Sequence, residues 1–173
     1  YRNRLDYRRT VSELSAALTS LLDLDEILGR VGRTVTEGLQ LQSLAVVLWL
    51  EEHTTLWRYD ERGGHMEPGA HPALGALHRA LARQPERPWH PERHGTTKDS
   101  GDDTAAAREE AARLGAALVI PLAVGGETIG ALALGRRRSG RSFSREDVEL
   151  LATLAAQSAV AVQNAHSYRA LQA

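Results

Sequence analysis

The sequence predicts an α+β fold in which two strand pairs lie between helices. Three observations support this prediction. Two apolar runs at 116–124 and 128–134 are joined by adjacent glycines, an earlier apolar run at 44–50 precedes an alternating segment at 55–60, and amphipathic helical patterns occupy both ends of the chain. Hairpins separated and flanked by helices in this way favour an α+β fold.

A heptad pattern marks the first helix, which we expect over residues 1–22. Apolar residues recur there at alternating spacings of four and three, at Tyr7, Val11, Leu14, Leu18 and Leu21. This spacing places them on one seam of a helix. A second helix follows Asp23, which can cap it in a capping box with Glu26, and ends near Gly38.

Two hairpins supply the strands. The first joins the buried run 44–50 to the alternating strand 55–60 across a polar turn. The second joins the two later apolar runs through Gly125-Gly126, a pair that tolerates the positive φ angles of a two-residue turn. Its runs are apolar on both faces, so we expect both faces of the sheet to be covered.

The segment between the hairpins is the least regular part of the chain. Glycines and prolines interrupt it after residue 62, and Pro72 then opens a short helix. Residues 84–103 carry three prolines and two glycines, which predicts a long loop with one short extended piece near Trp89. Residues 104–114 are Ala-rich and predict a helix that ends at Gly115.

The last helix has the clearest start signal. Ser144 is placed to cap it, Asp147 completes a capping box, and Phe143 and Val148 occupy the positions of a hydrophobic staple. We therefore expect a helix over 144–171. Its seam is rich in small residues that suit close helix packing, at Val148, Leu151, Ala155, Ser158, Val162 and Ala165.

Composition excludes several classes of function. The 173 residues fit a single domain, 1–173, with room for a core. There are no cysteines, so disulfides, thiol nucleophiles and cysteine metal sites are absent. The net charge of -1 gives no reason to expect nucleic acid or an anionic membrane. No apolar run approaches the roughly 20 residues that span a bilayer and no signal peptide precedes the first helix, so we expect a cytoplasmic piece of a longer protein.

The order of these motifs resembles a known family. The chain is similar to the C-terminal half of a GAF domain through Val119-Ile120-Pro121-Leu122, Gly125-Gly126, Ile129-Gly130-Ala131-Leu132, Phe143, Asp147, Leu150-Leu151 and Ala155-Ala156-Gln157. The resemblance is good over 116–168, fair over 11–60 and poor over 61–113. GAF domains are small cytoplasmic sensor modules of bacterial histidine kinases, phosphatases, cyclases and phosphodiesterases.

This resemblance implies α/β/α layers and a ligand pocket. A central antiparallel sheet of about five to six strands would carry the terminal helices on one face, with the segment 61–113 over a pocket on the other. Aromatic and histidine side chains would suit a planar ligand there, at Trp57, Tyr59, His71, His78, Trp89, His90 and His94. The alternative is that the two strand aromatics pack in the sheet and the histidines are exposed loop residues.

The residues argue against several cofactors, and the ligand stays unidentified. His90 and His94 have the spacing of a metal or haem site on a helix, but nearby prolines and a glycine oppose a helix, and we predict no metal. Covalent bilin attachment needs a cysteine. GAF domains that bind cyclic nucleotides carry an Asn-Lys pair and an Asp-Glu pair, whereas arginines precede Phe143 here and Val148 replaces the Glu.

No motif predicts catalysis by this chain. It has no Gly-rich phosphate loop, no Gly-x-Ser-x-Gly elbow and no His-Glu-x-x-His, and the free-methionine sulfoxide reductases of GAF-like fold need cysteines. The resemblance implies a sensory domain, first of a two-component histidine kinase and alternatively of a PP2C-type phosphatase or a diguanylate cyclase. A ligand-free structural dimerisation module is the alternative from another class.

The two terminal helices predict a homodimer. We expect protomers to pair through the helical seams, at Val11, Leu14, Leu18, Leu21, Leu151, Ala155 and Val162. Binding of a small molecule would then shift the last helix, and this shift would pass to an output domain after Ala173.

Overall fold

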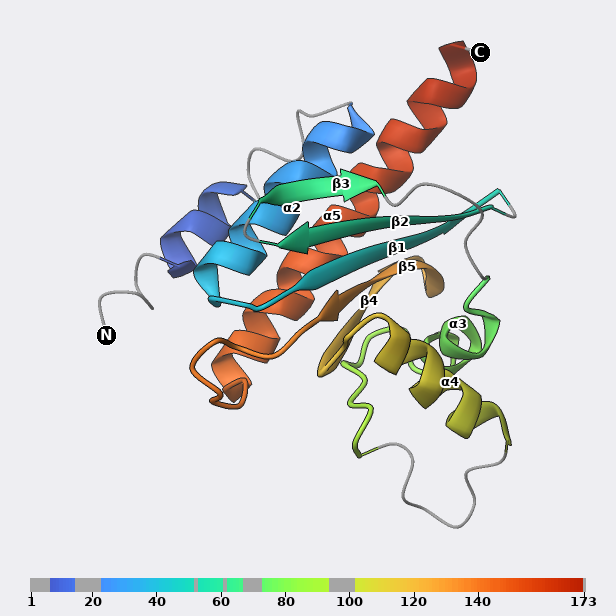
Figure 1. The fold of residues 1–173 in the computed structure, drawn as a ribbon. Helices are drawn as coiled ribbons and strands as arrows, with labels where there is room; N and C mark the ends of the chain where they lie inside the picture. The colour runs from blue at the N-terminus through green and yellow to red at the C-terminus, as the bar shows by residue number, and fades with distance from the viewer. Residues whose placement is uncertain are drawn as a thin grey trace.

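The computed structural model describes residues 7–14, 23–51, 53–60, 62–66, 73–93 and 102–172. After a helical segment at 7–14, its elements are α2 (Leu24–Gly38), β1 (Leu44–Leu50), β2 (His53–Asp60), β3 (Gly63–Met66), α3 (Gly75–Ala82), α4 (Asp102–Arg113), β4 (Leu118–Val124), β5 (Glu127–Leu134) and α5 (Arg145–Gln172) (Figure 1). The expected α+β class is confirmed.

In the described part of the chain, the strands form one antiparallel sheet of five strands in the order β3-β2-β1-β5-β4. Both predicted hairpins are present. In the β1–β2 hairpin, Leu50 pairs with His53. In the β4–β5 hairpin, Gly125 and Gly126 have φ angles of 58° and 81°, which the two adjacent glycines allow without strain. The β1–β5 pair joins the two hairpins, and β3 adds an edge strand.

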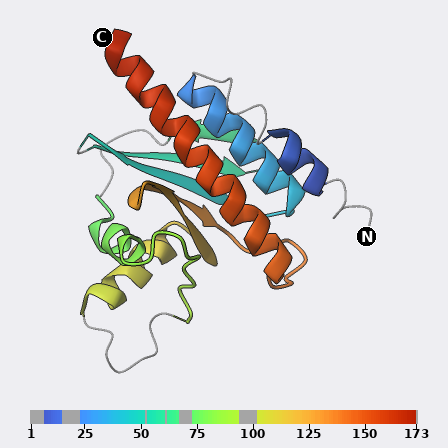
Figure 2. The ribbon, with the colours of Figure 1, turned by 180° about the vertical axis from the view of Figure 1, so that it is seen from behind.

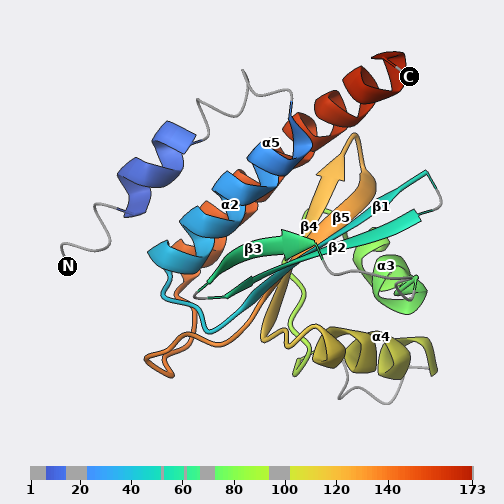
Figure 3. The same cartoon turned by 45° about the horizontal axis from the view of Figure 1, so that its top comes forward.

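Alternate side chains of the strands enter two separate cores. In β1, Leu44 and Val46 belong to the core that α2 and α5 share, whereas Ala45 and Val47 belong to the core of α3 and α4. Figures 2 and 3 show α2 and α5 side by side on one face of the sheet, with α3 and α4 on the other. The sheet is therefore covered on both faces, as the unbroken apolar runs predicted.

The segment near Trp89 extends the sheet locally. The Trp89 backbone N–H donates to the Val119 carbonyl at 2.7 Å, and the Val119 N–H donates to the Trp89 carbonyl at 2.9 Å. This confirms the expected extended piece. Pro121 lies two residues further along the same open edge of β4, where it has no N–H to continue the pairing.

The start of α3 is capped by a side chain from α4. The Glu110 carboxylate accepts hydrogen bonds from the backbone N–H groups of Ala76 at 3.3 Å and Leu77 at 2.7 Å. Asp103, in the first turn of α4, binds the Arg79 guanidinium at 2.7 Å. These contacts join α3 and α4 into one unit.

The predicted capping box opens α5. The Asp147 N–H donates to Ser144 Oγ at 3.1 Å, and the Ser144 N–H donates to Asp147 Oδ2 at 3.0 Å. Phe143 and Val148, the staple pair, are both half-buried against the core of α2 and α5. These four residues, two before the helix and two in its first turn, thus determine where it begins and how the chain enters it.

Loss of this cap gives a first prediction. Ser144→Ala should lower the free energy of unfolding by about 1 kcal/mol, because the Asp147 N–H loses its acceptor. Ser167→Ala is the matched control, since Ser167 is exposed on the same helix and alanine is the better helix former. Urea unfolding measures both variants. Equal stability of wild type and Ser144→Ala would contradict a role for the capping box.

The seams of the terminal helices lie inside the domain's own core. Each described seam residue is at most 7% exposed and packs in the core of α2 and α5, namely Val11, Leu14, Leu151, Ala155 and Val162. Leu18 and Leu21 lie outside the described residues. Side chains buried to this extent offer no surface to a second copy. At these five positions the side chains are packed within one chain, so they are not available to a second copy. The predicted dimer contacts at Leu18 and Leu21 stay predictions.

Candidate functional site

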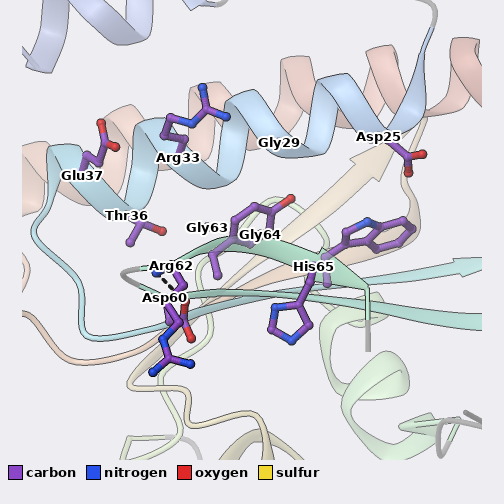
Figure 4. Close-up of a pocket in the computed structure, with 12 residues that line it drawn as sticks. Asp25, Gly29, Arg33, Thr36, Glu37, Asp60, Arg62, Gly63, Gly64 and His65 are labelled. Carbon is purple, nitrogen blue, oxygen red and sulfur yellow. Dashed lines mark hydrogen bonds between the residues drawn. The ribbon is translucent and has the colours of Figure 1, made fainter. Parts of the chain in front are cut away.

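A cavity of about 630 Å³ lies between α2 and the β2–β3 hairpin (Figure 4). Volumes in this range hold small organic ligands. The lining residues come from α2, from β2, from the turn after it and from β3, and they are Asp25, Gly29, Arg33, Thr36, Glu37, Trp57, Tyr59, Asp60, Arg62, Gly63, Gly64 and His65. The cavity is on the face of the sheet that carries α2, not the face beneath α3 and α4.

The side of α2 that borders this cavity carries charged residues and a glycine. Asp23 caps the helix, because its Oδ1 accepts from the Asp25 N–H at 2.9 Å. The apolar residues of α2 are buried in the core, which leaves Gly29, Arg33 and Glu37 at the cavity. A Cβ atom on Gly29 would meet no atom within 4 Å, so the space above this glycine is open.

Thr36 supplies a buried polar group without a partner. Its residue is 7% exposed, and its Oγ1 has no hydrogen-bond partner among the described residues. Figure 4 shows the side chain directed from α2 toward the β2–β3 hairpin. A buried hydroxyl without a partner costs about 1–3 kcal/mol. A ligand that bonds to Thr36 would recover this energy.

The Tyr59 ring is held between two glycines. A Cβ atom on Gly32 of α2 would come within 2.5 Å of the ring, and one on Gly64 of β3 would come closer still. Burial raises the pKa of Tyr59 from 10.0 to about 12, and Asp25 adds to the rise while Arg33 opposes it. The phenol therefore stays protonated at neutral pH.

This buried phenol predicts a loss of stability at alkaline pH. The folded chain keeps the Tyr59 proton up to a pKa of about 12, whereas the unfolded chain loses it near 10.0, so stability should fall as pH rises from 10 to 12. Tyr7, whose pKa burial also raises, adds to the fall. Tyr59→Phe should flatten the decline.

Urea unfolding at several alkaline pH values, with phenolate absorbance followed in parallel, tests this dependence. Equal pH slopes in Tyr59→Phe and wild type would contradict a buried Tyr59 phenol.

The ligand residues predicted from sequence divide between the two faces of the sheet. Trp57 and Tyr59 line the cavity beside α2, at 8% and 5% exposure. Trp89 is buried in the opposite core, and the neighbouring His90 is half-buried. His71 and His94 lie outside the described residues. The predicted set is therefore not brought together. Near Trp89, a smaller cavity of about 150 Å³ lies between the end of α3, the residues that follow it and Thr104 of α4.

His78 takes part in a packing arrangement on the α3 face. Its ring stacks on Trp49 with ring centroids 4.2 Å apart and an interplanar angle of 2°. Its Nε2 is 2.9 Å from the Thr128 carbonyl oxygen, so this nitrogen carries the proton and donates. The indole N–H of Trp49 donates to the Ala73 carbonyl at 2.8 Å. These bonds tie α3 and the residues before it to β1 and β5.

Comparison with known families decides what kind of domain this is. The family model described as the GAF domain matches residues 22–163. The chain belongs to the GAF domain family. Its antiparallel sheet with helices on both faces fits this membership, and the resemblance found in the sequence is confirmed at the level of the family.

Individual relatives of this GAF domain occur in regulatory proteins. The DNA-binding transcriptional activator HyfR of Escherichia coli (strain K12) is 29% identical over 180 residues, which cover 96% of this chain and 25% of HyfR. The chain thus spans about a quarter of that relative's length.

Two solved GAF domains illustrate the shared fold. One, from a phosphoenolpyruvate-protein phosphotransferase of Coxiella burnetii, has a TM-score of 0.61 and 15% identity, covering 96% of this chain and 98% of its own. The other, from the potassium sensor histidine kinase KdpD of Escherichia coli, has a TM-score of 0.54 and 18% identity, covering 95% and 98%.

Two of the ligand residues predicted from sequence line this cavity, although the pocket was expected on the opposite face of the sheet, and no residue of α2 was predicted. The prediction named Trp57 and Tyr59 but not Arg33, Thr36 or Glu37. One signal was available, since α2 contains two glycines in its interior, besides Gly38 at its end. A glycine within a helix often marks a close approach or a functional surface. Here Gly32 accommodates the Tyr59 ring and Gly29 borders the cavity.

Proposed function

We propose that this GAF domain is the cytoplasmic sensory domain of a bacterial signal-transduction protein and binds a small molecule in the cavity beside α2. The observation that carries the proposal is the unpartnered Thr36 hydroxyl, 7% exposed and facing a cavity of about 630 Å³. GAF domains act as sensory or regulatory domains, and similar structures come from a chemotaxis protein, a phosphotransferase and histidine kinases.

The position of α2 supports a route for the signal. This helix lines the cavity on one side and packs against α5 on the other. The C-terminal part of α5 extends past the sheet (Figure 1). A ligand that displaces α2 would therefore bear on α5 through their common core, and α5 would pass the change to an output domain after Ala173.

A homodimer would form through the outer face of α5. Its exposed large apolar residues are Val160 at 47%, Tyr168 at 43% and Leu171 at 87%. Spacings of eight and three residues place them on one side of a helix. Sedimentation of a monomer at high micromolar concentration would contradict this dimer.

Each described helix is too short or too polar to span a bilayer.

Several kinds of output domain are candidates. Our first assignment, from the family resemblance, is a two-component sensor histidine kinase, with a PP2C-type phosphatase or a diguanylate cyclase as further alternatives. The sequence relative HyfR is described as a transcriptional activator, which favours a second candidate, the input domain of a transcription factor. The sequence that follows Ala173 in the full-length protein distinguishes them.

Thermal shift against a broad metabolite panel tests the sensory role. We expect at least one compound to raise the melting temperature of the wild type and to lose this effect in Thr36→Val, because bound ligand at 100 times its Kd adds about 2.7 kcal/mol. Thr153→Val, at an exposed threonine of α5, is the matched control and should keep the response. The absence of any stabilising compound would instead favour a ligand-free dimerisation module.

A further inference from the structure

We infer that the outer edge of β4 binds an extended, uncharged peptide segment as an added strand. This site goes beyond the proposed sensory function, because the cavity at this edge shares no lining residue with the cavity beside α2. Three features carry the inference: backbone groups that β4 leaves without partners, the cavity that these groups face, and the scarcity of charge in its lining.

The outer edge of β4 carries unpaired backbone groups. The N–H and the C=O of Val119 both bond to Trp89 across this edge. Alternation along the strand then directs the Pro121 carbonyl and the Ala123 N–H and carbonyl to the same side. The register shift after Leu122 puts its extra residue on β5, so the alternation continues along β4. Among the described residues, none bonds to these three groups of Pro121 and Ala123 from outside the sheet.

Prolines keep the neighbouring segment from pairing with these groups. Pro85 and Pro88 lie in the segment that follows α3, and neither has an N–H to donate to β4. The Arg87 N–H is used within the segment, where it donates to the Gln84 carbonyl at 3.0 Å. The pairing is therefore limited to the bridge at Trp89. Beyond it, a cavity of about 500 Å³ is lined both by this segment and by β4.

The cavity has the length and the walls for a short strand. Its remaining walls carry small residues, with Gly125 and Gly126 in the β4–β5 turn and Ala152 and Ala156 on α5. At about 3.3 Å per residue, β4 runs for about 10 Å from Pro121 to its end, which is room for three or four residues of an added strand. The small residues leave space for a side chain of the peptide beside α5.

The lining favours a neutral backbone over a charged ligand. Of the described residues that line the cavity, Glu86 alone is charged, so no guanidinium or ammonium group is present there to hold a phosphate or a carboxylate. One residue of an extended peptide presents its N–H and C=O on the same edge, as Ala123 does. A second peptide N–H, two residues along, reaches the Pro121 carbonyl in either strand direction.

Titration of isotope-labelled protein with acetylated and amidated tripeptides of Gly, Ala, Ser, Val and Leu, followed by NMR, tests this site. At least one tripeptide should shift the Ala123 amide resonance and slow its hydrogen exchange, because this N–H gains an acceptor. N-methylation of the first or the third residue of that tripeptide should weaken binding about tenfold, since a carbonyl of β4 then loses its donor. N-methylation of the middle residue should have a much smaller effect, because only alternate N–H groups face β4.

Variants of the two walls locate the peptide. Ala123→Pro removes the edge N–H without removing a bond to β5, and it should weaken the same tripeptide about tenfold. Ala123→Ser keeps this N–H and is the matched control. Ala156→Leu, at an exposed position of α5, narrows the cavity and should also weaken binding. Thr153→Leu is its control, since Thr153 is exposed on the same helix but does not line the cavity.

The outcomes are separate from those of the cavity beside α2, whose test uses Thr36→Val. Failure of every tripeptide to shift the Ala123 amide overturns the inference. Equal sensitivity to N-methylation at all three residues overturns strand addition. Binding that neither Ala123→Pro nor Ala156→Leu weakens overturns the assignment to this edge.

Discussion

Val162→Asp is expected to unfold the domain under conditions in which Val160→Asp leaves it folded. The two valines are two residues apart on α5, yet Val162 is 0% exposed in the core of α2 and α5 and Val160 is 47% exposed. A carboxylate at 162 would be buried among apolar side chains without a partner. An uncompensated buried charge costs about 3–5 kcal/mol, which is a large fraction of the roughly 5–15 kcal/mol that stabilises a typical domain.

Val160→Asp is the control for Val162→Asp. Val160→Asp introduces the same side chain as Val162→Asp and the same change in helix propensity. It should therefore lower the free energy of unfolding by no more than about 1 kcal/mol. Urea unfolding of both variants measures the difference, and sedimentation adds a second reading because Val160 is placed in the proposed dimer contact. Equal stabilities of the two variants would show that the seam of α5 is not part of the core.

Local signals in the sequence determined most of the fold. Gly125-Gly126 fixed a turn, and Ser144 with Asp147 fixed the start of α5, because each depends only on residues within a few positions. Apolar runs gave the strands for the same reason. For Trp89, by contrast, the sequence predicted an extended piece but not its pairing with Val119, because that partner is thirty residues away.

The heptad seams show where a periodic pattern becomes ambiguous. A row of Val, Leu and Ala residues on one side of a helix is equally suited to a second copy and to the chain's own sheet. The choice depends on which surface is nearby in the folded chain, and Val11 and Val162 pack within the chain. Periodicity identified the buried side of each helix correctly and could not identify its partner.

The cavity could not be predicted from the sequence for a related reason. It forms where α2 crosses the β2–β3 hairpin, so Thr36 and His65 line the same cavity although no motif links them. The family resemblance was weakest in part of this region and directed attention to the opposite face. Nothing in the sequence distinguishes Thr36 from an ordinary helix residue, because its lack of a hydrogen-bond partner is a property of the folded chain alone.

Gly32→Ala is expected to cost about 2 kcal/mol and to weaken ligand binding, although alanine is the better helix former. The new Cβ atom would come within 2.5 Å of the Tyr59 ring, and Gly64 closes the other side of the slot, so the ring cannot withdraw. Overpacking of this kind costs about 1–3 kcal/mol. Any displacement of the ring also alters the wall of the cavity, because Tyr59 lines it.

Gly29→Ala provides the contrast three residues earlier on the same helix. Its Cβ atom would meet no atom within 4 Å, so the variant should be more stable than wild type by about 0.5–1 kcal/mol. A double-mutant cycle with Tyr59→Ala isolates the clash, because Gly32→Ala should cease to destabilise once the ring is absent. If Gly32→Ala destabilised the chain equally with and without the ring, the slot would not be the reason for a glycine in α2. If the cost vanishes with the ring, Gly32 is explained by Tyr59, and Tyr59 in turn joins α2 to β3 across the cavity.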